Sequence, residues 1–411
     1  MKRDAQPLRF VIVGHVDHGK STLIGRLLFD TDALPQDKIE EIKKDTDNQD
    51  LAFAHLLDHF EEERLQDLTI DTTQVFFKTK KRDYIIIDAP GHREFIRNMI
   101  TGATQAEAGI LIIDVKEGMK EQTKRHAYFL SLLGIEQLIV VINKMDLVGY
   151  RRDDFIKVKM RVEKFLNKIG MKPSFYIPVS CLEGENITIT SGRMPWYKGG
   201  SLLKNLDRLK KKPSSIKKPF IFPVQDVFKL NGKRLILGKV EAGILRKDSK
   251  VKVLPEGKLA TPNSIEKYKS SLKEAGTGES IGITIKESLF IERGDVLCLP
   301  GKEPKVKDKF WAMIIWLEEE PFNKDMFLSI RCATQKTTCR IQKIRRRIDS
   351  ESLSTIKENT PLIKYLEVAE VLIKTERPLV LEPFKRLPVL GRFVLEKGSD
   401  ICAGGIVLED D

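Results

Sequence analysis

The first half of the chain alternates short apolar runs with longer segments in which apolar residues recur every three or four positions. The apolar runs at residues 10–13, 74–78, 84–88, 108–115, 137–143 and 174–180 predict buried strands. Amphipathic segments at residues 21–29, 91–102, 120–133 and 152–169 predict helices between them. Such alternation is typical of a doubly wound, mostly parallel sheet with ligands at the carboxyl ends of its strands. We therefore expect an α/β domain over residues 1–208.

The pattern changes after residue 208. Residues 209–219 are charged, bounded by proline and without apolar periodicity, which is typical of a linker. Short β-type runs then lie at residues 220–228, 234–242, 250–254, 279–285 and 295–297, and a second set lies at 310–317, 326–333, 337–347, 365–373, 392–396 and 404–408. Closely spaced short strands separated by glycine turns are typical of closed barrels. We expect two all-β barrel domains, over residues 220–302 and 303–411.

A glycine-rich turn separates the first predicted strand from the first predicted helix. It consists of Gly14, His15, Val16, Asp17, His18, Gly19, Lys20, Ser21 and Thr22, in the spacing of a P-loop. The two glycines let the backbone curl, so that successive N–H groups point at one anionic group. Lys20 is expected to reach the outer phosphates, and Ser21 to place a hydroxyl on Mg²⁺. The strand-to-helix context favours a nucleotide site over a structural turn.

Two further motifs follow later strands and indicate which base is bound. Asp146 can accept hydrogen bonds from the N1–H and the exocyclic amine of guanine, a pair that adenine lacks. Asn143 is expected to brace the loops, and Lys144 to lay its stem against the base. The predicted strand at residues 174–180 leads into Ser180, Cys181 and Leu182, whose amides are expected to cap the guanine O6. The alternative interpretation of residues 143–146 is a helix-capping turn.

A third group of residues has the chemistry for hydrolysis. Asp88 ends a predicted strand and is suited to hold Mg²⁺ through water, and the Gly91 amide can approach a γ-phosphate because no Cβ intervenes. His92 follows that amide and is expected to orient the attacking water. Thr69, in a loop before a predicted strand, is a candidate second hydroxyl ligand of the metal mostly through its resemblance to a known family pattern. The assigned catalytic residues are therefore Lys20 and His92, and the assigned metal ligands Ser21, Thr69 and Asp88.

Composition and charge restrict the class of protein. Hydrophobic residues make up 41% of the chain and charged residues 32%, as in a globular protein. No apolar run approaches the roughly 18 residues of a membrane span, so we expect a cytoplasmic protein without a membrane partner. We also expect no DNA partner. The 5 scattered cysteines predict free thiols. The net charge of +12 fits a nucleic-acid or acidic-protein partner, or only a solvated surface.

Taken in order, these motifs resemble those of the translation-factor class of GTPases. The phosphate loop at residues 14–22, the metal motif at 88–92, the guanine motif at 143–146 and the capping motif at 180–182 all match that class. The resemblance covers nearly the whole chain and implies a GTPase domain followed by two β-barrels, with GTP or GDP and Mg²⁺ bound. One departure lies at Gln66 and Asp67, because family members usually have glycine just before the first switch motif.

Two branches of this class compete. Residues 93–103 and 222–227 resemble elongation factor 1-alpha, whereas residues 24–31, 315–321, 336–347 and 367–380 look like the GTPase subunit of heterodimeric sulfate adenylyltransferase. We expect the second branch, in which GTP hydrolysis is coupled to adenylyl sulfate formation from ATP and sulfate on a small adenylyltransferase subunit. The alternatives are a carrier of aminoacyl-tRNA to the ribosome, whose basic segments at residues 210–218 and 336–347 would meet phosphates, and a stand-alone GTPase switch.

Overall fold

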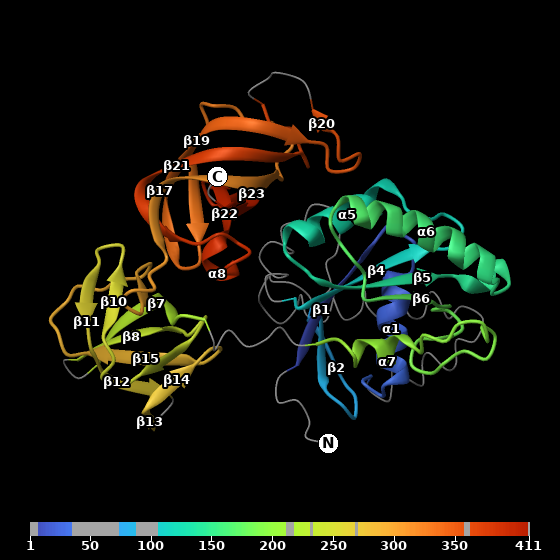
Figure 1. Ribbon diagram of the computed structural model, residues 1–411, viewed down its shortest axis with the longest axis horizontal. Helices are drawn as coiled ribbons and strands as arrows, with labels where there is room; N and C mark the ends of the chain where they lie inside the picture. The colour runs from blue at the N-terminus through green and yellow to red at the C-terminus, as the bar shows by residue number, and fades with distance from the viewer. Residues whose placement is uncertain are drawn as a thin grey trace. The chain divides into compact units, whose positions relative to one another are not determined.

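The computed structural model describes residues 7–34, 74–87, 106–210, 218–230, 233–267, 270–356 and 362–409. The chain divides into two compact units, Met1–Lys211 and Lys212–Asp411, shown from blue to green and from yellow to red in Figure 1. The helix expected at residues 91–102 lies outside the described residues. So do the candidate site residues Thr69, Asp88, Gly91 and His92.

A six-stranded sheet in the order β2-β3-β1-β4-β5-β6 forms the centre of the first unit. Its strands are β1 (Leu8–Gly14), β2 (Gln74–Lys78), β3 (Asp83–Ile87), β4 (Ala108–Asp114), β5 (Gln137–Asn143) and β6 (Phe175–Pro178). Strands β3, β1, β4, β5 and β6 pair in parallel, and only the edge strand β2 is antiparallel to its neighbour. The predicted mostly parallel sheet is confirmed.

Helices cover both faces of this sheet. They are α1 (Lys20–Asp30), α5 (Glu121–Leu132), α6 (Arg152–Lys168), α7 (Leu202–Leu206) and the short 3₁₀ helix η2 (Met145–Val148). Apolar residues of α1 and α7 share one core with Leu8, Phe10 and Ile12 of β1. Because side chains alternate along a strand, Val11 and Val13 face the opposite side, where α5 contacts β1 and β4 (Figure 1). None of the described helices is long and apolar enough to cross a membrane.

The first barrel of the second unit surrounds a core that contains Phe220, Phe222 and Ile283. Its strands are β7 (Ile221–Leu230), β8 (Lys233–Lys239), β9 (Ile244–Arg246), β10 (Val251–Leu254), β11 (Lys258–Ala260), β12 (Pro262–Lys267), β13 (Ser270–Leu272), β14 (Glu274–Gly276), β15 (Ser280–Ile285) and β16 (Val296–Cys298). Eight of them form one sheet in the order β11-β10-β16-β7-β8-β15-β12-β13, and β14 pairs with β9. The short strands β9 and β11 to β14 were not predicted, because runs such as Lys258–Ala260 carry almost no apolar signal.

The second barrel closes on itself. Its elements are β17 (Lys305–Trp316), β18 (Leu328–Cys332), β19 (Gln335–Ile348), β20 (Thr355–Ile356), β21 (Val368–Leu381), α8 (Pro388–Gly391), β22 (Arg392–Lys397) and β23 (Asp400–Val407). The order is β18-β22-β23-β17-β21-β19-β20, and an additional pairing of β18 with β19 completes the ring. Trp316, Phe322 and Phe393 fill its core. The two predicted barrels are confirmed as the fold class, whereas their exact limits stay a prediction.

The two barrels share an apolar contact that makes them one unit. Ile221, Val296 and Cys298 of the first barrel are buried in one cluster with Val380 and Leu390 of the second. Burial of apolar side chains between two folded modules stabilises their association by roughly 25 cal/mol for each Å² removed from water. The barrels are therefore expected to unfold together.

Replacing Gly391 by alanine should destabilise the second unit. A Cβ at this position would lie 2.6 Å from the Phe384 nitrogen and 2.7 Å from the Glu382 carbonyl oxygen, both backbone atoms that cannot move aside cheaply. We expect Gly391→Ala to lower the free energy of unfolding by about 1–3 kcal/mol. Gly192→Ala is the matched control, because a Cβ added there would have nothing within 4 Å. Differential scanning calorimetry measures both, and an unchanged Tm for Gly391→Ala would refute the packing argument.

Candidate nucleotide-binding site

The loop between β1 and α1 is held by close contacts at both of its glycines. A Cβ on Gly14 would come within 2.7 Å of the Ile112 Cγ2 atom on β4. Gly19 has φ 92°, in the left-handed region that glycine adopts without strain, and it precedes the first residue of α1, Lys20. The Lys20 ammonium folds back over the loop, donating to the carbonyl oxygens of Gly14 at 3.3 Å and His15 at 2.8 Å. Because α1 begins directly after this loop, the loop lies at the N-terminus of the helix, where an anion is stabilised.

Asn143, at the carboxyl end of β5, joins three loops. Its Nδ2 donates to the His18 carbonyl oxygen at 2.9 Å, and its Oδ1 accepts from the Cys181 amide at 3.0 Å. The side chain is 2% exposed, so both hydrogen bonds lie in a medium where they are hard to replace by water. The bracing role predicted for Asn143 matches this geometry, which ties the phosphate loop to the loop that follows β6.

Asp146 lies in η2 and is oriented by Ser180. The Ser180 hydroxyl donates to Asp146 Oδ1 at 2.6 Å and also accepts from the Glu183 amide at 3.3 Å. Because a carboxylate has about four lone-pair positions, Asp146 keeps acceptor capacity for a ligand that offers two N–H groups. Ser180 is fully buried, and its hydroxyl fixes the orientation of the Asp146 carboxylate.

A cavity of about 480 Å³ lies between these loops. It is lined by Val16, Asp17, Gly19, Lys20, Ser21, Thr22, Asn143, Lys144, Asp146, Leu147, Cys181 and Leu182. Apart from Leu147, every lining residue was a candidate from the sequence. A cation and helix amides at one end and a carboxylate at the other are the donor and acceptor set that a guanine nucleotide requires, and Ser21 brings a hydroxyl to the same cavity.

The two histidines of the loop lie behind the cavity and do not line it. The His18 imidazole is fully buried, 3.4 Å from the Ile112 carbonyl oxygen and 3.4 Å from Glu117 Oε2, and burial lowers its pKa. His15 Nδ1 lies 2.5 Å from Gln122 Oε1 on α5. Both side chains therefore support the loop from the side of β4 and α5, while the sequence assigned them to nucleotide contact.

Asp114 is a charged residue of the site that sequence reasoning missed. It ends β4, is 3% exposed, and places Oδ2 3.0 Å from the Lys144 ammonium. Burial opposes its ionisation, but hydrogen bonds from Lys144 and from the Lys116 and Glu117 amides outweigh that cost and lower its pKa. A carboxylate at the end of an otherwise apolar strand is the signal that could have revealed it.

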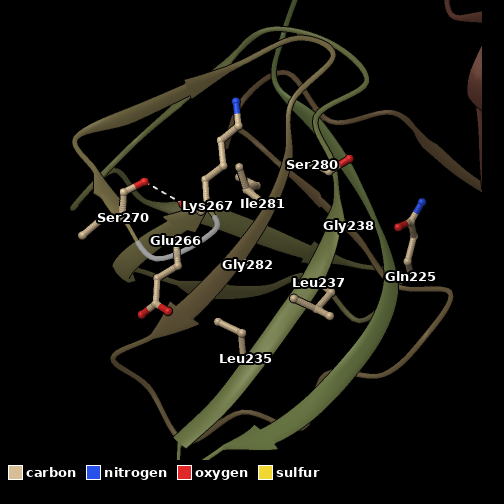
Figure 2. A pocket seen from close by; sticks show the side chains of 11 residues that line it. Gln225, Leu235, Leu237, Gly238, Glu266, Lys267, Ser270, Ser280, Ile281 and Gly282 are labelled. Atoms are coloured by element: carbon tan, nitrogen blue, oxygen red, sulfur yellow. Dashed lines mark hydrogen bonds between the residues drawn. The ribbon is translucent and has the colours of Figure 1, made fainter.

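A second cavity, of about 670 Å³, lies on the first barrel (Figure 2). Its apolar walls come from Leu235, Leu237 and Ile281, and its polar lining from Gln225, Glu266, Lys267, Ser270, Ser271 and Ser280. Gly238 and Gly282 also line the cavity, and a Cβ on Gly282 would lie 2.8 Å from the Leu235 Cδ1 atom. Nothing in the sequence pattern pointed to this cavity, because its residues come from strands far apart in the chain.

The β1–loop–α1 unit, the parallel sheet and the base-binding loops define a P-loop GTPase domain. Residues 6–215 match the family described as the elongation factor Tu GTP binding domain, and residues 309–408 match the one described as GTP-eEF1A C-terminal domain-like. The chain is 37% identical to elongation factor 1-alpha of Methanoregula boonei, over 98% of this chain and 97% of the relative. It is 39% identical to that of Thermoplasma acidophilum, over 97% and 96%, and 37% identical to that of Thermococcus gammatolerans, over 99% of both.

The chain therefore belongs to the elongation factor Tu and elongation factor 1-alpha family of GTPases. Proteins of this family bind GTP and GDP with Mg²⁺, as the sequence predicted. The donor set around the cavity fits that ligand.

The predicted role as a subunit of sulfate adenylyltransferase is wrong, and so is its predicted small adenylyltransferase partner. The relatives at 37–39% identity over nearly the whole chain are elongation factors 1-alpha. Two of the segments that favoured the sulfate branch, at residues 336–347 and 367–380, fall on β19 and β21, whereas most of residues 315–321 follows the end of β17. Buried and exposed positions alternate along the first half of β19, residues 335–341, so barrel packing selects much of that sequence whatever partner the protein has.

Asp146→Asn should change the base that the protein prefers. The side-chain NH₂ of asparagine would face the N–H donors of guanine, so two donors would meet without an acceptor. We therefore expect GTP binding to weaken by about 100-fold, which is roughly 2.7 kcal/mol. Xanthosine triphosphate carries a carbonyl oxygen in place of the exocyclic amine and should bind the variant better than the parent. Equilibrium titration with both nucleotides measures the change. Equal weakening for the two nucleotides would contradict a direct contact between Asp146 and the base.

Proposed function

We propose that this protein is a GTP-dependent carrier of aminoacyl-tRNA to the ribosome. The observation that carries the proposal is the extent of the similarity to elongation factors 1-alpha, which runs through the GTPase domain and both barrels. A match confined to residues 6–215 would support nucleotide binding alone. The additional match at residues 309–408 supports a shared partner, because the barrels are the part of the chain outside the nucleotide site.

In the proposed reaction the protein positions GTP and neutralises charge. The Lys20 ammonium and the N-terminal amides of α1 stabilise the charge that develops on the phosphate oxygens. From the sequence motifs, Ser21, Thr69 and Asp88 would hold Mg²⁺, which would supply further charge neutralisation. His92 orients the attacking water, an assignment that rests on the sequence motif.

The second unit offers two features that suit the aminoacyl end and the body of a tRNA. The cavity on the first barrel combines apolar walls for a base or a side chain with Gln225, Glu266 and Ser280, which can bond to ribose hydroxyls and an amino group (Figure 2). On the second barrel, β19 exposes a row of cations. These are Lys336, Arg340, Lys343, Arg345 and Arg346. Lys336 pairs with Glu396, and Arg345 and Arg346 pair with Glu370, so a phosphodiester backbone would compete with these carboxylates for the row.

The RNA proposal predicts selective protection of the aminoacyl ester. With a non-hydrolysable GTP analogue bound, the protein should slow spontaneous deacylation of aminoacyl-tRNA by about tenfold or more at saturation, because the ester is withdrawn from water. The GDP-bound protein is the control and should protect less. Deacylated tRNA should compete poorly. Salt-sensitive binding of charged and uncharged tRNA with equal affinity would instead reflect only the net charge of +12 and would refute the proposal.

The assignment of His92 makes a separate prediction. His92→Ala should leave GTP affinity within about twofold and slow single-turnover hydrolysis by about 100-fold, because a general acid–base or water-orienting group contributes typically 10²–10⁴ in rate. Binding is measured by titration and hydrolysis by phosphate release. Parallel loss of affinity and rate would assign His92 to nucleotide binding.

A further inference from the structure

The carboxylate of Asp114 faces two loops at once. Its backbone pairs with Asn143 at the end of the parallel β4–β5 ladder, so it lies at the edge of the sheet where the nucleotide loops begin. Oδ1 accepts from the Lys116 amide at 2.7 Å and the Glu117 amide at 3.2 Å, which shapes the turn after β4. The other carboxylate oxygen, Oδ2, lies 3.0 Å from Lys144 Nζ. One buried side chain therefore links the β4 turn to the base loop.

Lys144 needs such an anchor to define the cavity wall. Its backbone is in the left-handed region with φ 62°, and its side chain is 33% exposed and lines the nucleotide cavity. A free lysine side chain loses roughly 2 kcal/mol of rotamer entropy when it is ordered, so an unanchored stem would be a poor surface for a base. The Asp114 carboxylate, whose side chain is 4% exposed, holds the ammonium where solvent screens the pair little.

The turn shaped by Asp114 also supports the phosphate loop. Glu117, whose amide donates to Asp114, places Oε2 3.4 Å from His18 Nε2. The His18 carbonyl oxygen in turn accepts from Asn143, which closes a circuit through the loops at β1, β4 and β5. Loss of the Asp114 charge can thus be separated from loss of its turn-capping role, since the two functions use different oxygen atoms.

We propose that Asp114 is a positioning residue for nucleotide binding, which holds Lys144 along the wall that contacts the base and so slows nucleotide release. The proposal rests on the assignment of the guanine base to the cavity between Lys144 and Asp146. It does not depend on the RNA partner. The contact between Asp114 and the nucleotide is indirect, through Lys144.

A double-mutant cycle on the full chain tests the proposal. Asp114→Asn keeps an oxygen for the two turn amides but removes the charge, and Lys144→Met keeps the apolar stem but removes the ammonium. We expect Asp114→Asn to raise the dissociation rate of fluorescent GDP by about tenfold in stopped flow. The double variant should release GDP no faster than the faster single variant. Asp153→Asn, a change at an exposed residue in the first turn of α6, is the charge-matched control and should have the parent rate.

A second nucleotide separates positioning from loss of structure. Inosine diphosphate lacks the exocyclic amine, so Asp146 distinguishes it from GDP, whereas the Lys144 stem contacts any purine. Asp114→Asn should therefore speed release of both nucleotides by the same factor. A parent-like rate for Asp114→Asn, additive effects in the cycle, or a selective loss for GDP would each overturn the proposal. If Lys144→Met and Asp146→Asn also leave both rates unchanged, the assignment of the base to this cavity fails as well.

Discussion

The side-chain amide of Asn143 is the interaction on which the nucleotide site depends. This buried side chain donates one hydrogen bond from Nδ2 to the His18 carbonyl oxygen. Its Oδ1 accepts a second hydrogen bond from the Cys181 amide. An amide buried in this way costs free energy unless both bonds form, so the phosphate loop and the loop after β6 are ordered together or not at all. The Asp114–Lys144 pair and the Ser180–Asp146 bond then orient the charged groups on loops that Asn143 already holds in place.

The parallel sheet determines where the loops that Asn143 joins begin. β1, β4, β5 and β6 pair in parallel, so Gly14, Asp114 and Asn143 arrive at the same edge although Gly14 lies 100 residues before Asp114 and 129 before Asn143. The close approach of Gly14 to the Ile112 side chain shows how little space separates the phosphate loop from β4. Charged residues at this edge are consequently partly buried and paired, as in the contact between Asp114 and Lys144.

The barrels are held by a different principle. Their cores come from inward-facing residues of many short strands, and closure of the second barrel depends on the pairing of β18 with β19. Short strands such as β13 and β14 gain stability only as part of a larger sheet arrangement, which explains why they leave weak traces in the sequence. The same packing constraint misled the choice between two branches of the family, because barrel strands carry similar alternations in proteins with different partners.

Local patterns in the sequence were sufficient for the GTPase fold and for most of the cavity lining. Apolar periodicity located β1, β4, β5, α1 and α6 to within about two residues, because those elements are long or fully buried. The chemistry of phosphate and guanine recognition restricts residue types so strongly that the sequence alone singled out Lys20 and Asp146, both of which line the cavity. The inward turn of His18, the pairing of Asp114 with Lys144 and the cavity on the first barrel were decided only by the tertiary structure. Each depends on contacts between distant segments, whose geometry no local pattern encodes.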